Sequence, residues 1–61
     1  MSINSWEQAI DYLLNVDSFY YHPKCVLSES GGLIYIKVND NKVIKRSPDN
    51  AIRYLNAHIQ F

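Results

Sequence analysis

The sequence predicts an α+β fold in two layers, with the element order α-β-β-β-α. Residues 5–13 recur 42 positions later as residues 47–55 with five of the nine positions identical, which indicates a similar amphipathic helix near each end. Between the repeats, residues 33–38 alternate in the manner of a strand, and segments rich in Gly, Asn and Asp stand on both sides. We therefore expect one small globular domain, 1–61, in which both helices pack on one face of a three-stranded antiparallel meander.

The first helix is expected to run from about Ser5 to Val16. Its apolar side chains recur every three or four residues and fall on one broad arc, which is typical of a helix lying on a core. These side chains are Trp6, Ala9, Ile10, Leu13, Leu14 and Val16. Ser5 followed three positions later by Gln8 is typical of a capping box, in which the two side chains accept hydrogen bonds from two otherwise unpaired amides.

Three strands are expected after this helix. Leu33–Val38 is the central strand because β-branched residues alternate along it. Cys25–Glu29 precedes it across residues 30–32, whose two glycines allow positive φ, and Lys42–Arg46 follows it across residues 39–41, whose Asn and Asp side chains tolerate the same conformation. Both connections are short enough for hairpins, which predicts the antiparallel meander.

Residues 17–24 allow two interpretations. The stretch is too aromatic for a plain loop, yet Pro23 has no amide hydrogen to donate to a central strand. We therefore expect an edge segment that is interrupted at His22 and Pro23, so that the first strand begins at Cys25 or as early as Phe19.

The second helix has the clearest boundary in the chain. Ser47 is the expected N-cap, and Pro48 occupies the first helical position, where its missing amide hydrogen costs nothing. Asp49 complements the positive end of the helix dipole. The expected buried stripe consists of Ala51, Ile52, Leu55 and Ile59.

No group of residues has the types and spacing that catalysis, a cofactor or a metal ion requires. Cys25 is the only cysteine, and neither histidine has a second ligand at metal spacing. Glu7 and Asp11 stand one helical turn apart, but on a side expected to face solvent, where paired carboxylates are ordinary solvated charges. We therefore expect no enzyme activity, no cofactor and no small-molecule substrate.

Composition and charge place the chain among soluble proteins. Hydrophobic residues make up 48% of it, but no apolar run approaches the ~18 residues of a membrane span. The N-terminal residues lack the basic start and apolar run of a secretory signal, and a lone cysteine fits a reducing compartment. We expect a cytoplasmic protein that does not contact membranes. The net charge is zero but unevenly divided, because residues 1–36 carry −3 and residues 37–61 carry +3.

Aromatic residues form the first candidate site, which consists of Trp6, Phe19, Tyr20 and Tyr21. Such rings either fill the core of a small domain or form a surface patch, because aromatic residues are enriched at the centres of protein interfaces. Together with unpaired sheet edges and the divided charge, they favour a small non-catalytic protein-interaction module. We expect it to act as a regulator or inhibitor by binding a partner protein, or to form a homodimer.

A second candidate site lies on the sheet face that the helices leave open. Alternation places there Val26, Ser28, Tyr35, Lys37, Val43 and Lys45. With its neighbours this face offers cations for phosphates and an aromatic ring for base stacking, namely Tyr35, Lys37, Lys42, Lys45 and Arg46. The alternative function is therefore nucleic-acid binding by this basic face.

The order α-β-β-β-α is similar to that of double-stranded-RNA-binding domains and of the small toxins built on that fold. The resemblance covers the order of the elements rather than sequence motifs, and it implies a nucleic-acid-binding module. Double-stranded-RNA-binding domains carry lysines at the start of the second helix, whereas this chain has residues 47–50, Ser-Pro-Asp-Asn, with Lys45 and Arg46 just before them. The toxins depend on a histidine in the sheet, and here only His22 stands near an expected strand.

Overall fold

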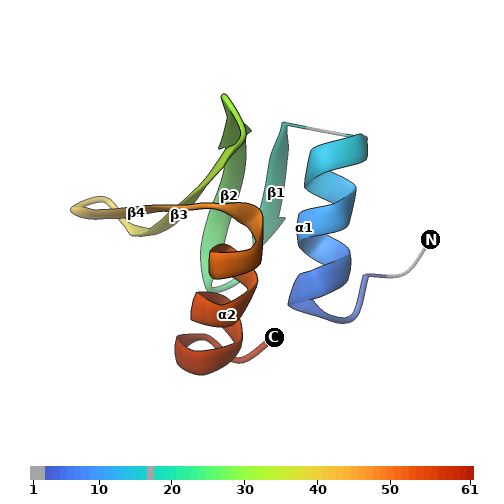
Figure 1. Cartoon of the computed structure of the whole chain (residues 1–61). Helices are drawn as coiled ribbons and strands as arrows, with labels where there is room; N and C mark the ends of the chain where they lie inside the picture. The colour runs from blue at the N-terminus through green and yellow to red at the C-terminus, as the bar shows by residue number, and fades with distance from the viewer. Residues whose placement is uncertain (1–2, 17) are drawn as a thin grey trace.

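The computed structural model describes residues 3–16 and 18–61, and within them the chain forms two helices and one four-stranded sheet (Figure 1). The elements follow one another as α1 (Trp6–Asn15), β1 (Phe19–His22), β2 (Cys25–Ser30), β3 (Leu33–Asn39), β4 (Lys42–Arg46) and α2 (Pro48–His58). The α+β class is confirmed. The predicted number of strands is wrong, because the sheet has four strands in the order β1-β2-β3-β4.

The additional strand, β1, comes from the stretch whose sequence allows two interpretations. It pairs with β2 in antiparallel register, with His22 opposite Cys25. The two residues between them therefore form a turn rather than a break within one edge strand. A turn residue needs no hydrogen bond to a neighbouring strand. The missing amide hydrogen of Pro23 therefore leaves the pairing of β1 and β2 intact. Asp17, at the start of the same stretch, lies outside the described residues.

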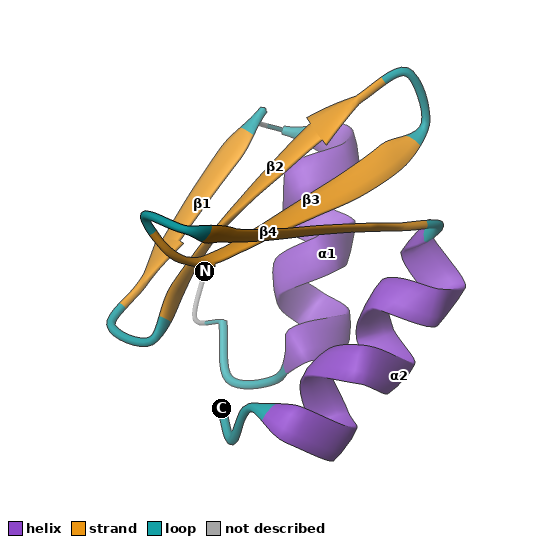
Figure 2. Ribbon diagram, turned by 90° about the vertical axis from the view of Figure 1, so that its left-hand side faces the viewer, coloured by secondary structure: helices purple, strands orange, loops and turns teal. Residues whose placement is uncertain are grey.

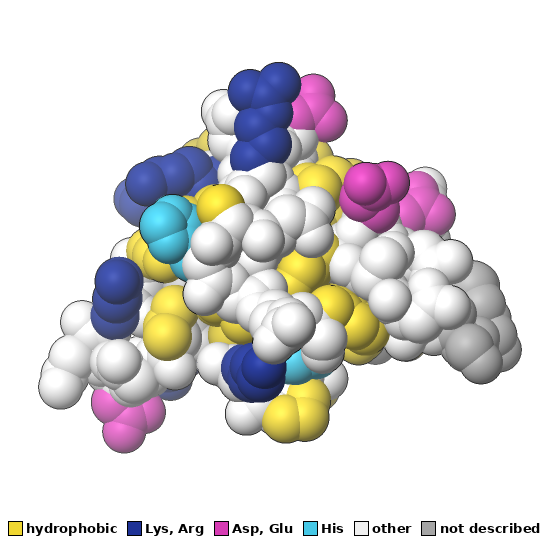
Figure 3. Space-filling model, turned by 90° about the horizontal axis from the view of Figure 1, so that it is seen from below, with side chains coloured by type: hydrophobic (Ala, Val, Ile, Leu, Met, Phe, Trp, Pro, Cys, Tyr) yellow, Lys and Arg dark blue, Asp and Glu magenta, His cyan; other side chains and the backbone are white. Residues whose placement is uncertain are grey.

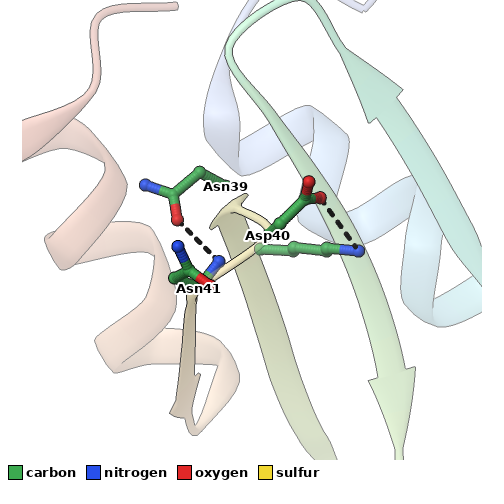
Figure 4. Close-up of polar contacts among 4 residues, drawn as sticks. Asn39, Asp40 and Asn41 are labelled. Atoms are coloured by element: carbon green, nitrogen blue, oxygen red, sulfur yellow. Dashed lines mark hydrogen bonds and ion pairs between the residues drawn. The ribbon is translucent and has the colours of Figure 1, made fainter.

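Two further hairpins join the remaining strands, and their turns differ. Gly31 and Gly32 connect β2 to β3 with φ of 60° and 82°, as the sequence predicts for a glycine turn. The positive φ predicted for the β3–β4 turn is absent. Instead the register shifts between Lys37 and Asn39, and the Asn39 side-chain oxygen accepts a 2.8 Å hydrogen bond from the Asn41 amide (Figure 4).

Both helices lie on the same face of the sheet (Figure 2). α1 packs on β1 and β2, α2 packs on β3 and β4, and the two helices contact each other. The core between the layers consists of Trp6, Ala9, Ile10, Leu13, Cys25, Leu27, Ile34, Ile36, Ala51 and Leu55. In the part of the chain that the structure describes, no helix is long and apolar enough to cross a membrane.

The repeated segments occupy equivalent places in the two helices. Ala9 in α1 and Ala51 in α2 are both completely buried against the sheet. Leu13 and Leu55, one turn further along, are buried in the same core. The repeated sequence therefore places equivalent side chains of the two helices against two halves of one sheet.

The two helix starts differ in their capping hydrogen bonds. Ser5 Oγ accepts a hydrogen bond from the Gln8 amide at 3.2 Å. The Gln8 side chain accepts one from the Asn4 amide at 2.9 Å, so it reaches one residue further back than in the predicted capping box. Ser47 occupies the predicted N-cap position of α2, but its side chain makes no capping hydrogen bond. Only α1 is therefore fixed at its start by side-chain capping.

Candidate functional site on the open sheet face

The sheet face opposite the helices carries two rows of side chains that span all four strands, and we call this surface the open face. Cross-strand pairing places the first row in the order Phe19, Ser28, Tyr35 and Lys45. The second row, two residues along each strand, consists of Tyr21, Val26, Lys37 and Val43. Successive residues of a strand point to opposite faces, so all eight side chains project away from the helices. The six residues predicted for this face are all present, and β1 adds two aromatic rings.

Apolar side chains of the open face are accessible to solvent. Tyr21 is 74% exposed, Val43 53% and Phe19 50%. Val26 and Tyr35 are half-buried between them. Exposed apolar groups that adjoin one another mark interaction surfaces in soluble proteins, whereas single ones are ordinary. On the open face Phe19 and Tyr21 adjoin each other, whereas Val26 and Lys37 separate Val43 from Tyr21.

Lysines supply all of the charge in the two rows. Lys45 Nζ lies 5.9 Å from the centre of the Tyr35 ring, and Lys37 stands beside Val43 in the second row. Asp40, in the β3–β4 turn, lies 4.0 Å from Lys37 Nζ (Figure 4), but its side chain is fully exposed, so solvent and salt screen this ion pair. Two positive charges therefore lie among aromatic and aliphatic side chains without a carboxylate in either row.

Two aromatic rings stand in parallel at the β1 edge of the open face. The Phe19 and Tyr21 ring centroids are 6.4 Å apart, and the ring planes differ by only 15°. Because the two residues are separated by one position on a strand, both rings project from the same face. One edge of the open face is therefore aromatic, while the lysines lie on β3 and β4.

The predicted aromatic group is divided between the core and the surface, the two places that the sequence left open for it. Trp6 is only 1% exposed, and its indole N–H donates a 2.7 Å hydrogen bond to the Ile59 carbonyl oxygen. Tyr20 points to the helix side of the sheet, where its ring centroid lies 6.2 Å from that of Tyr12. Alternation along β1 thus leaves only the other two members of the group on the open face.

The predicted basic group is divided in the same way. Its tyrosine and two of its lysines lie on the open face, whereas Lys42 and Arg46 alternate to the other side of β4. Arg46 Cζ lies 6.0 Å from the Tyr54 ring centre on α2, and Arg46 Nη1 donates a 2.8 Å hydrogen bond to the Lys45 carbonyl oxygen. The structure therefore joins part of each predicted group into one surface. The sequence signal that connects the two groups is the alternation within residues 19–22. This alternation assigns side chains to a face only if these residues form a strand.

His22 has a structural role that its position in the sequence does not reveal. Its Nδ1 accepts a 3.1 Å hydrogen bond from the Lys24 amide, and its Nε2 lies 3.1 Å from the Phe61 backbone oxygen. The imidazole also packs on the Trp6 indole, with 4.6 Å between ring centroids. Both ring nitrogens are thus engaged in holding the β1–β2 turn and the C-terminal residues.

The thiol of Cys25 lies in the core and is 5% exposed. Burial raises the pKa of this thiol above its ordinary value, which keeps the sulfur protonated. Burial, and to a smaller extent the charge of an ionised Cys25, also raise the pKa of Tyr20. Among residues 3–16 and 18–61, no three His, Cys, Asp or Glu side chains come close enough to hold a metal ion.

A shallow groove of about 520 Å³ runs between α1 and α2. Its charged lining contains Glu7, Asp11 and Asp49 against Arg53, so acidic side chains are in excess there. Figure 3 views the molecule from below and shows acidic side chains at the right, at the top beside a basic side chain and at the lower left, with Lys and Arg side chains mostly to the left and top. The helix layer and the open face therefore differ in the sign of their charge.

Three comparisons with known proteins give no match to a protein-family model, a curated protein or a solved structure. The element order also departs from that of double-stranded-RNA-binding domains, because β1 adds a fourth strand. The chemistry of the open face is therefore the basis on which a function can be proposed.

Proposed function

We propose that the protein is a small non-catalytic binding module that contacts an anionic partner through the open face. The observation that carries this proposal is the combination of exposed aromatic and aliphatic side chains with two lysines on one uncovered sheet surface, whose two rows contain no carboxylate. The apolar area supplies contact, and the lysines favour partners of opposite charge.

Residues away from the open face also support binding rather than covalent chemistry. A nucleophilic cysteine needs a thiolate, but Cys25 is buried and its pKa is raised. Both ring nitrogens of His22 are engaged with backbone groups, so neither is free to contact a substrate. A regulator or inhibitor that acts by occupying a partner needs neither group.

A second copy of the chain is a less favourable partner for this face than an anionic molecule. Packing two open faces together would bury Lys37 and Lys45 of each copy, and the two rows contain no carboxylate to pair with them. A partner protein with an acidic surface, or a nucleic acid, would instead neutralise both lysines. The charge on the open face therefore favours binding to an anionic partner over self-association.

Retention on immobilised heparin tests whether the open face binds anions. The wild-type protein should be retained at low salt, and replacing both Lys37→Glu and Lys45→Glu should abolish retention because the charge of the face is reversed. The matched control, Lys42→Glu with Arg53→Glu, changes the net charge equally but leaves the open face intact, so it should keep most of the retention. Equal loss in both double variants, or no retention of the wild type, would contradict the proposal.

A further inference from the structure

We infer that the anionic partner is a single-stranded nucleic acid and that each row of the open face holds one nucleotide. This inference rests on the proposed function and specifies its ligand. Each row combines a ring on β1 with a lysine on β3 or β4, pairing Phe19 with Lys45 and Tyr21 with Lys37. A ring and a cation are the two groups that recognise a nucleotide without reading its sequence, by base stacking and by phosphate contact.

The positions of the cations suit phosphates that follow β3. Lys45 extends from β4 so that its Nζ lies 5.9 Å from the Tyr35 ring on β3, and Lys37 belongs to β3 itself. Neighbouring strands are about 4.8 Å apart, so the backbone of β3 lies roughly 10 Å from that of β1. With its bases over β1 and its phosphates over β3, a single nucleic-acid strand would therefore run along the direction of the β-strands.

The parallel rings on β1 are arranged to receive bases in a common orientation. Phe19 and Tyr21 have ring planes only 15° apart, so a strand can stack a base on each ring without twisting between them. Tyr35 provides a further ring in the first row.

This arrangement favours a single strand over a duplex or an acidic peptide. Bases in a duplex are stacked on one another inside the helix, so their flat faces cannot reach Phe19 or Tyr21, whereas unpaired bases can turn onto protein rings. An acidic peptide would pair with the lysines but would offer the two rings no flat partner. Of these three ligands, only a single strand offers both unpaired bases to the rings and phosphates to the lysines.

Fluorescence anisotropy of a labelled short single-stranded oligonucleotide of mixed sequence tests the stacking part of the inference. Tyr21→Leu should weaken binding by about five- to 150-fold, the range measured when a stacking ring is lost. Tyr21→Phe keeps the ring and should bind like the wild type. Tyr21 is 74% exposed, so both variants should fold, which their circular dichroism spectra verify.

The dependence of affinity on salt tests the phosphate part. Each phosphate contact made with a single strand adds about 0.7 to the slope of log affinity against log salt, so Lys37→Ala should lower the slope by about 0.7. Tyr21→Leu should leave the slope unchanged because stacking releases no counterions. Arg53→Ala removes the same charge from the helix layer and should also leave the slope unchanged.

Competition with unlabelled polyglutamate and with a duplex of the same sequence separates this inference from the proposed function. Polyglutamate that competes as well as the single strand, together with wild-type affinity of Tyr21→Leu, would overturn the nucleic-acid inference and leave an anionic protein as the partner. Tighter binding of the duplex would also overturn the inference. Failure to bind either the oligonucleotide or polyglutamate would overturn both proposals.

Discussion

The indole of Trp6 joins parts of the chain that are far apart in sequence. Its N–H bonds to the Ile59 carbonyl oxygen, and its ring contacts His22 from β1 and Phe61 from the C-terminal residues, with 4.9 Å between the Trp6 and Phe61 centroids. A domain of this length has a free energy of unfolding of about 3–9 kcal/mol, so one such anchor is a large part of the total. Trp6 therefore contributes to stability rather than to the binding surface.

Replacing Trp6→Phe should lower the free energy of unfolding by about 1–3 kcal/mol, because the part-buried Ile59 oxygen loses its donor. Urea unfolding measures the change. Tyr21→Phe removes a polar group from an exposed ring and should change the free energy by less than about 0.5 kcal/mol. Equal changes in the free energy of unfolding for the two variants would show that the indole hydrogen bond does not anchor the C-terminal residues.

The buried thiol predicts how stability responds to alkaline pH. In the unfolded chain a cysteine loses its proton near a pH of about 8.5, whereas burial raises the pKa of Cys25 in the folded state. The contribution of the protonated thiol to the free energy of unfolding is therefore fully present below about pH 8.5. It is lost as the pH rises toward the folded-state pKa, because the thiol ionises first in the unfolded chain. Between pH 7.5 and about 9.5, the wild type should lose more stability than Cys25→Ala, as measured by urea unfolding at each pH. Parallel losses would contradict this account.

At the scale of elements, the two related helices allow a matched test of capping. Ser5→Ala should lower the free energy of unfolding by about 1 kcal/mol, because Ser5 Oγ accepts a hydrogen bond from the Gln8 amide. Ser47→Ala should cost less than half as much, because the Ser47 side chain makes no capping bond. Thermal or urea unfolding compares the two variants, and a larger cost at Ser47 would contradict the capping difference between α1 and α2.

Element boundaries follow from local sequence where one signal dominates. Ser47 and Pro48 fix the start of α2, and the alternation of Leu33–Val38 identifies the central strand. β1 could not be separated from β2 on the same basis, since Pro23 is compatible with a broken edge strand and with a turn. The choice depends on pairing of Phe19–His22 with β2, which buries one side of β1 against α1.

At the scale of the whole molecule, the helices cover one sheet face and the open face is left for binding. Alternation in the sequence placed Tyr35, Lys37 and Lys45 there correctly, because a strand with one buried face has only one register that buries its apolar side. The aromatic residues were assigned to a separate site, since nothing local to Phe19 and Tyr21 shows that β1 extends the same surface. The binding surface is thus a product of strand pairing rather than of any contiguous motif.

Mapping the contact surface by NMR tests the central claim that the open face is where the partner binds. A single-stranded oligonucleotide added to ¹⁵N-labelled protein should shift the amide signals of the three strands that carry the rings and lysines, with the largest changes around Tyr21, Tyr35 and Lys45. Signals of α1 and α2 should stay in place, including those of Asp11 and Arg53 in the groove between the helices. Shifts confined to that groove, or no shifts at saturating oligonucleotide, would contradict the account.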